Sequence, residues 1–192
     1  SSDLYGKDAV AVAISDRYTN EEAYAMKKMA NVMGAKTLCF NNRASGLAPV
    51  LGFDASPNTI DELLSTDVIL AAGFDTVSNP VMQLKLRQAA ANGAKVILVN
   101  PEGYEQHFEF AERVIYTKNE LTFFRGVAKA LLEAGKTSDV AGFEAFKESL
   151  ADAATCDDCR GVAELYGNAK KAMIVFTQNF VTTEAASLLA DI

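Results

Sequence analysis

Gly93-Ala94-Lys95-Val96-Ile97-Leu98-Val99 is the stretch that decides the fold. Glycine takes the left-handed conformation that ends a helix, and the lysine suits the negative end of that helix. The four apolar residues that follow have no polar alternation, which is typical of a strand covered by helices on both faces. The stretch therefore predicts the end of a helix and the start of a buried parallel strand.

The same design recurs along the chain. Glycine and lysine lead into an apolar run at two further junctions, and other apolar runs stand between helical patterns. The predicted strands are residues 9–14, 37–40, 68–72, 96–99, 114–115 and 172–176. Strands that alternate with helices predict an α/β fold, a doubly wound, mainly parallel sheet with helices on both faces in three αβα layers.

Helix starts are marked between these strands. Residues 19–22 and 117–120 both have the Thr-x-x-Glu pattern of a capping box. Asn79-Pro80 is typical of a cap followed by proline at the first helical position. We expect a Rossmann-like domain over residues 1–135, a helical connector over 136–160 and the start of a further αβ unit over 161–192. Because a helical pattern is still running at residues 191–192, we expect a piece of a longer protein.

Composition excludes some classes of partner. The 192 residues are 49 % apolar and 22 % charged, which is ordinary globular usage. The net charge of -7 and the lack of a basic run argue against nucleic acid. No apolar stretch approaches the roughly twenty residues that span a bilayer, so we expect no direct membrane insertion.

The three cysteines do not form a disulfide framework, and reduced thiols fit a cytoplasmic setting. Cys39 lies in an apolar run and is typical of a buried hydrophobe. Cys156 and Cys159 form a Cys-x-x-Cys, but with His107 as the one histidine the chain lacks the ligands of a closed metal site. A redox pair normally opens a helix directly after a strand. The acidic helical pattern before Cys156 favours a surface turn instead.

Ligands of open α/β sheets bind beyond the carboxyl ends of the strands. That rule selects four loops rich in small and amide side chains, residues 15–20, 73–79, 100–106 and 177–182. The alternative is that their polar residues cap helices and close turns. Neither a Gly-x-Gly-x-x-Gly nor a phosphate-binding Walker loop is present, and no catalytic constellation is recognisable. We therefore expect no turnover from this chain alone.

Three motifs in fixed order carry a family resemblance. Thr19-Asn20-Glu21-Glu22-Ala23-Tyr24 opens a helix that leads to a loop with Arg43. Asp67-Val68-Ile69-Leu70-Ala71-Ala72-Gly73-Phe74-Asp75 is followed by Asn79-Pro80-Val81, and the stretch from Gly93 continues to Asn100-Pro101. In order, spacing and element type, these motifs resemble the molybdopterin oxidoreductases, a family that includes formate dehydrogenase large subunits. The resemblance covers about residues 9–190.

The resemblance implies a domain that holds a molybdopterin guanine dinucleotide across the strand ends. It implies iron–sulfur clusters only in other parts of the parent protein, and as partners the parent's other domains and electron-transfer subunits. The implied cofactor contacts are Asn20, Arg43, Gly73, Asp75, Asn79, Pro80, Asn100, Pro101 and Glu102. Ser45 stands near the position of the family's molybdenum ligand, so it is a candidate oxygen ligand for molybdenum. An ordinary loop serine is the alternative.

Ser45 itself departs from formate dehydrogenases, in which a molybdenum-binding cysteine or selenocysteine follows the arginine closely, and the sequence departs from the family at two further places. The family's Asp-Pro-Arg is here Asn100-Pro101-Glu102, which puts a negative charge where a phosphate or guanine would lie. The family's Gly-Thr-Asp is replaced by Lys118-Asn119-Glu120. Both changes weaken the expected cofactor site.

Three hypotheses follow. The departures favour a scaffold domain of an electron-transfer complex, similar to the large iron–sulfur subunit of NADH:quinone oxidoreductase, in which the fold persists without molybdenum. The alternative is the cofactor domain of an active formate dehydrogenase-like molybdenum or tungsten oxidoreductase. The central domain of a thiamine-diphosphate enzyme shares the fold type, but its flanking motifs are missing here.

Overall fold

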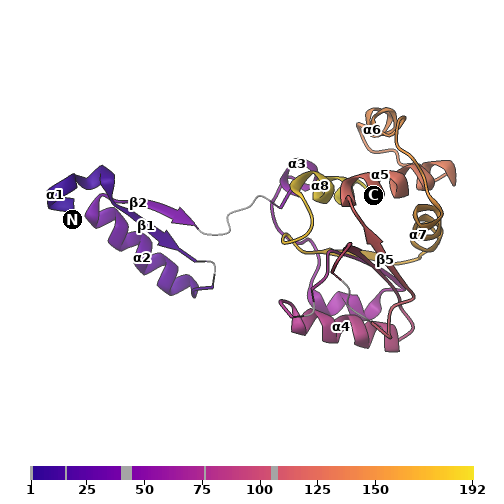
Figure 1. The fold of residues 1–192 in the computed structure, drawn as a ribbon, viewed down its shortest axis with the longest axis horizontal. Coiled ribbons are helices and arrows are strands. Elements are labelled where there is room, and N and C mark those ends of the chain that lie inside the picture. The colour runs from indigo at the N-terminus through magenta and orange to yellow at the C-terminus, as the bar shows by residue number, and fades with distance from the viewer. Residues whose placement is uncertain (1, 16, 40–44, 76, 105–107) are drawn as a thin grey trace. The chain divides into compact units, whose positions relative to one another are not determined.

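The computed structural model describes residues 2–15, 17–39, 45–75, 77–104 and 108–192 (Figure 1). The chain divides into two compact units, Ser1–Arg43 and Ala44–Ile192. The domain boundaries expected at residues 135 and 161 stay predictions.

The first unit is a β-α-β arrangement. Its elements are α1 (Ser2–Tyr5), the 3-10 helix η1 (Lys7–Ala9), β1 (Ala11–Ile14), α2 (Asn20–Met33) and β2 (Lys36–Cys39). The two strands are parallel, with Ala11 opposite Lys36. The predicted capping box of α2 is confirmed, since the Glu22 N–H donates to Thr19 Oγ1 at 3.3 Å and the Thr19 N–H donates to Glu22 Oε2 at 2.9 Å.

The second unit is built on a four-stranded parallel sheet. Its strands, in the spatial order β5-β4-β3-β6, are β3 (Val68–Ala72), β4 (Lys95–Pro101), β5 (Arg113–Thr117) and β6 (Ala172–Phe176). Ala72 is opposite Val99 on one side and Phe176 on the other. The carboxyl ends of the three strands therefore lie at the same edge of the sheet.

Helices cover both faces of this sheet. They are α3 (Ala48–Leu51), the 3-10 helix η2 (Ile60–Ser65), α4 (Pro80–Ala91), α5 (Glu120–Glu133), α6 (Phe143–Ser149), α7 (Asp157–Gly167) and α8 (Thr183–Asp191). Figure 1 shows α4 on one side of the sheet and α5, α7 and α8 on the other. The predicted αβα layering is confirmed. Among the residues described, no helix is both long and apolar enough to cross a membrane.

The continuous apolarity of β3 is explained by two separate cores. Val68, Leu70 and Ala72 pack into a cluster with side chains of α5, α7 and α8, whereas Ile69 and Ala71 pack into a second cluster with those of η2 and α4. All five residues are buried. Because successive side chains of a strand point to opposite faces, neither the odd nor the even positions tolerate a polar residue.

The start of α5 differs from the predicted capping box. The N-cap is Asn119, whose side chain accepts the Thr122 N–H at 2.9 Å, so a cap at Thr117 is wrong. Thr117 is the last residue of β5 and is opposite Pro101 in the sheet. Sheet pairing therefore continues through Thr117 and the helix begins later. Glu120 accepts the Thr182 N–H at 3.3 Å instead of completing the box.

Asp67 fastens β6 to β3 at the amino end of the sheet. Its carboxylate accepts the backbone N–H of Lys170 at 2.8 Å and that of Lys171 at 2.9 Å. Its own N–H donates to the Lys171 carbonyl at 3.0 Å. The N–H donors of Lys170 and Lys171 hold the pKa of the Asp67 carboxyl below its ordinary value of 3.8.

We predict that this contact is lost in acid. A carboxyl whose pKa is depressed by folding stabilises the fold above its ordinary pKa, and the contribution disappears as the pH falls through the folded pKa. Asp67→Asn is expected to lower the urea midpoint measured by circular dichroism at pH 7, and to have a smaller effect near pH 3. The control is Asp139→Asn, which changes an exposed carboxylate between α5 and α6. Equal effects of Asp67→Asn at both pH values would contradict the prediction.

Candidate functional site

The carboxyl ends of β3 and β4 bring together several of the predicted cofactor residues. Gly73 and Asp75 follow β3, while Asn100 and Pro101 are the last residues of β4. Gly73 has a φ of +62°, and its N–H donates to the Val99 carbonyl at 2.7 Å. Because β3 and β4 are parallel, the loops that follow them lie at the same edge of the sheet, as predicted.

Asn100 joins the two loops through its side chain. Its Oδ1 accepts the Phe74 N–H at 2.8 Å, and its Nδ2 donates to the Phe74 carbonyl at 3.3 Å. The residue is 1 % exposed. The oxygen and the nitrogen of the side-chain amide therefore both bind the backbone of Phe74, in the loop after β3.

Asp75 is also committed to nearby groups of the chain. It is buried, and its carboxylate accepts the Val77 N–H at 2.9 Å and the Ser78 hydroxyl at 2.5 Å. A hydrogen bond to the Asp75 carboxylate raises the pKa of the Tyr104 hydroxyl. Asp75 thus positions Tyr104 over the strand ends.

An aromatic pair covers this edge. The rings of Tyr104 and Phe180 lie 4.8 Å apart, and Tyr104 comes from the loop after β4 while Phe180 comes from the loop after β6. A Cβ at Gly73 would stand 2.6 Å from the Phe180 Cβ, so only glycine fits beneath it. We call these two side chains the Tyr104–Phe180 pair.

A small gap lies beside Phe180 at the strand ends. A gap of about 10 Å³ lies between residues of the β3, β4 and β6 loops, including Gly73, Asn100 and Phe180. That is room for about one water molecule. A pterin or guanine ring is too large for this gap.

The charges at this edge are negative or paired. Glu102 lies 4.0 Å from Lys118, an exposed ion pair that contributes little. Asp75 and Glu120 add carboxylates on either side of the strand ends. Like charges repel, so these carboxylates disfavour a phosphate, and Lys118 is paired with Glu102.

The other predicted residues have different surroundings. Asn79 is the N-cap position and Pro80 the first residue of α4, but the Asn79 side chain donates to the Asp75 carbonyl at 3.3 Å rather than capping the helix. Asn20 is the first residue of α2 in the other unit. Arg43 lies outside the described residues. The roles of all these residues in binding a cofactor stay predictions.

Ser45, the candidate molybdenum ligand, contacts Asp54. Its hydroxyl donates to the Asp54 carboxylate, which also accepts the Ser45 N–H at 3.1 Å. Both line a hollow of about 640 Å³ that runs along β6. No group of three or more histidine, cysteine, aspartate or glutamate side chains that could hold a metal ion occurs among the described residues.

The two loops that supply the aromatic pair were both predicted from the sequence to bind a ligand. The signal that favours a filled edge is the placement of one aromatic residue in each loop, Tyr104 in residues 100–106 and Phe180 in residues 177–182. Aromatic side chains prefer to contact one another when they cover apolar surface.

Comparison with known proteins identifies the family. A sequence model described as molybdopterin oxidoreductase matches residues 2–189. The chain belongs to the molybdopterin oxidoreductase family. The predicted resemblance is thereby confirmed.

Relatives in the family are much longer than this chain. The "Probable oxidoreductase YjgC" of Bacillus subtilis is 26 % identical over 166 residues, which are 78 % of this chain and 17 % of that protein. Formate dehydrogenase H of Escherichia coli is 28 % identical over 199 residues, 90 % of this chain and 28 % of that protein. The NADPH-Fe(3+) oxidoreductase subunit alpha of Geobacter sulfurreducens is 26 % identical over 198 residues, 90 % of this chain and 24 % of that protein. The chain therefore spans less than a third of each of these relatives.

The Asn100 bridge gives a prediction for the site edge. Asn100→Ala leaves the buried Phe74 N–H without its partner, which is expected to cost about 1–3 kcal/mol. Hydrogen exchange of a peptide over residues 68–74, followed by mass spectrometry, measures the loss of protection. The matched control is Asn168→Ala, an exposed asparagine at the end of α7. Equal protection of this peptide in both variants would contradict the structural role of Asn100.

Proposed function

We propose that this chain is a scaffold domain of a molybdopterin oxidoreductase-like electron-transfer protein, with a degenerate molybdopterin guanine dinucleotide site. The parent is proposed to be an iron–sulfur subunit similar to that of NADH dehydrogenases. The observation that carries the proposal is the Tyr104–Phe180 pair at the strand ends, in which Phe180 packs against Gly73.

The electrostatics of the edge support the same function. Glu102 stands where the family has an arginine, and the buried Asp75 is a few residues from the end of the adjacent strand. Arginine binds phosphate and guanine through a planar set of N–H donors that glutamate lacks. A site in which glutamate replaces this arginine therefore favours neither the phosphates nor the guanine of the dinucleotide.

An assembly role also has a structural basis. β6 is the edge strand of the sheet as described, and the hollow of about 640 Å³ beside it is lined by residues along its whole length. An open strand edge presents unpaired backbone groups that another segment satisfies. We propose that other domains of the parent chain dock there, and that electron-transfer subunits complete the complex.

One observation favours the second candidate function. Formate dehydrogenase H is similar to 90 % of this chain, so the likeness is not confined to a few motifs. Under this alternative the domain holds the pterin cofactor of an active molybdenum or tungsten oxidoreductase. The Tyr104–Phe180 pair would then have to move away from Gly73 when the cofactor binds.

Metal and pterin content of the full-length parent separates the two candidates. We expect iron without molybdenum, tungsten or pterin when the purified protein is analysed by elemental mass spectrometry and by pterin fluorescence after oxidation. A molybdopterin protein taken through the same purification is the control for cofactor loss. About one equivalent of molybdenum or tungsten with pterin would overturn the scaffold proposal, and would make Ser45 the next residue to change.

A second prediction tests whether the proposed dinucleotide site is still present beneath the Phe180 ring. Phe180→Ala together with Glu102→Arg removes the ring over Gly73 and restores the donor. We expect guanosine diphosphate to bind this variant at least about tenfold more tightly than it binds the original chain, since a hydrogen bond to a charged group contributes ~1.5–3 kcal/mol. Titration calorimetry measures the affinity.

The matched control combines Phe180→Ala with Glu112→Arg. Glu112 is exposed and directly precedes β5, so it lies at the amino end of the parallel sheet and undergoes the same charge change. Binding by the control as tight as by the Glu102→Arg variant would indicate a non-specific charge effect. No binding by either would indicate that the pocket itself has been lost.

A further inference from the structure

Cys156 and Cys159 stand at the start of a helix, not in a surface turn. Cys156 is the N-cap of α7, and its sulfur accepts the Cys159 N–H at 3.2 Å. The interpretation of a surface turn is therefore wrong. The acidic residues 157 and 158 form the first turn of α7, which the sequence signals only through the Cys-x-x-Cys spacing and the following periodicity.

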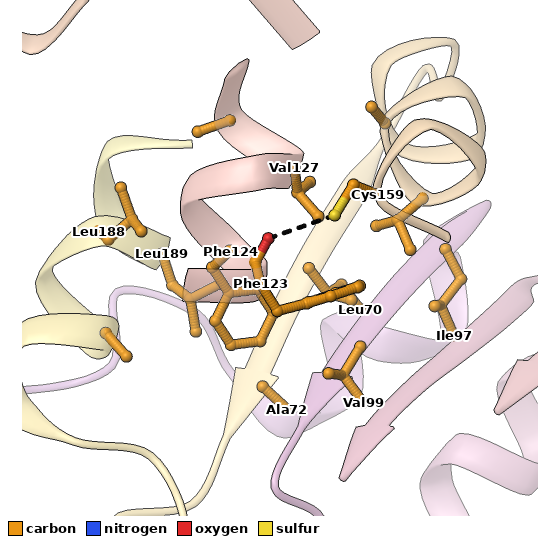
Figure 2. Packing of buried hydrophobic residues seen from close by; sticks show 14 of the residues in the cluster. Leu70, Ala72, Ile97, Val99, Phe123, Phe124, Val127, Cys159, Leu188 and Leu189 are labelled. Atoms are coloured by element: carbon orange, nitrogen blue, oxygen red, sulfur yellow. Dashed lines mark hydrogen bonds between the residues drawn. The ribbon is translucent and has the colours of Figure 1, made fainter. Parts of the chain in front are cut away.

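The two thiols differ in access but touch each other. Cys156 is exposed, whereas Cys159 is 2 % exposed within the larger core cluster. Their sulfurs lie 2.8 Å apart. Figure 2 shows the Cys159 sulfur directed at the Phe123 carbonyl of α5, at a distance of 3.7 Å. Cys156 is therefore accessible to solvent, whereas Cys159 lies in the core, and their sulfurs are in contact.

Tight packing against α5 fixes this geometry. A Cβ at Gly126 of α5 would stand 2.7 Å from the Cys159 sulfur and 2.7 Å from the Ala154 carbonyl, so glycine is what allows the two segments to approach. Lys129 of α5 donates to the Ala151 carbonyl at 2.9 Å and to the Ala153 carbonyl at 2.7 Å. The segment that leads into Cys156 is thus fastened to the helix that contacts Cys159.

Charges around the pair are largely balanced. The two carboxylates between the cysteines each have an arginine partner, Asp157 with Arg160 at 3.0 Å and Asp158 with Arg113 at 3.6 Å. These ion pairs are exposed and screened. They nevertheless keep unpaired negative charge away from the sulfur that faces solvent.

We propose that Cys156 and Cys159 form a reversible dithiol–disulfide pair that exchanges with low-molecular-weight disulfides, with Cys156 as the thiol that reacts first. Exposure assigns the first step to Cys156, and contact between the sulfurs assigns the second step to Cys159. Burial raises the pKa of the Cys159 thiol to about 12, which keeps it protonated until the second step. The pair is independent of the proposed function, because it rests on the packing of α7 against α5.

The thiol–disulfide exchange needs only the two cysteines and one small disulfide. The Cys156 thiolate attacks one sulfur of a small disulfide such as oxidised glutathione, which breaks that S–S bond and releases one glutathione thiolate. The Cys159 sulfur then attacks the Cys156 sulfur, the second glutathione leaves, and the proton of Cys159 passes to it. Two protein thiols are oxidised and one small disulfide is reduced to two thiols. The protein sulfurs need only approach from 2.8 Å to the bonded distance of roughly 2 Å.

The test incubates the purified chain without oxygen in defined mixtures of oxidised and reduced glutathione. After acid quenching and alkylation, trypsin releases one peptide, residues 148–160, that contains both cysteines. We expect this peptide to lose two hydrogens and to carry no glutathione, with an extent that follows the glutathione ratio and reverses on reduction. A peptide that stays reduced, or that accumulates bound glutathione, would overturn the proposal.

Two variants assign the order of the steps, each made with Cys39→Ala to leave only the pair. Cys159→Ser is expected to accumulate glutathione on Cys156. Cys156→Ser is expected to react at least about tenfold more slowly at pH 8, because the remaining thiol of Cys159 is 2 % exposed and its burial raises its pKa. Equal rates in the two variants would refute Cys156 as the entry thiol. Circular dichroism confirms that each variant is folded, and the peptide test on the unmodified chain does not depend on either.

Discussion

Burial of β3 on both faces is the constraint on which the rest of the second unit depends. Its five residues lie between two apolar clusters, so the strand needs a layer of helices on each side. Fully burying one large aliphatic side chain contributes about 1.5–3 kcal/mol, and β3 and β4 together supply most of the interior of the sheet. The parallel register that follows brings the ends of β3, β4 and β6 to one edge. The location of the candidate site is thus a consequence of the core.

The residues at that edge make hydrogen bonds that the fold itself requires, whether or not a ligand binds. A strand that stops leaves backbone N–H and carbonyl groups that must be paired when they are buried. Asn100 pairs those of Phe74, and Gly73 adopts a positive φ that lets its N–H reach the Val99 carbonyl. Amides and glycines are also the groups that suit a nucleotide. Composition of a strand-end loop therefore cannot distinguish a binding site from a closed edge.

Features of the fold that depend on residues close together in the sequence were predicted, and those that depend on distant residues were not. The strands and the capping box at Thr19 depend on neighbours within a few residues, and they were predictable. The cap of α5 was not, because pairing of Thr117 with Pro101 across the sheet prolongs β5. The meeting of Tyr104 with Phe180 joins two loops far apart in the sequence. The sequence showed each aromatic residue but not that their rings would occupy the same space.

The candidate site lies at the margin of the larger core, which explains how the fold outlasts a change in the site. Of the two side chains that lie against Gly73, Phe180 belongs to neither apolar cluster, whereas Val181 belongs to the larger one. Loss of a ligand there leaves the burial of β3 unchanged, but it leaves the strand ends open to water. An aromatic pair closes that edge and keeps the Asn100–Phe74 hydrogen bonds buried, where a hydrogen bond is costly to break. The aromatic pair therefore stabilises the domain without a ligand, as the proposed scaffold role requires.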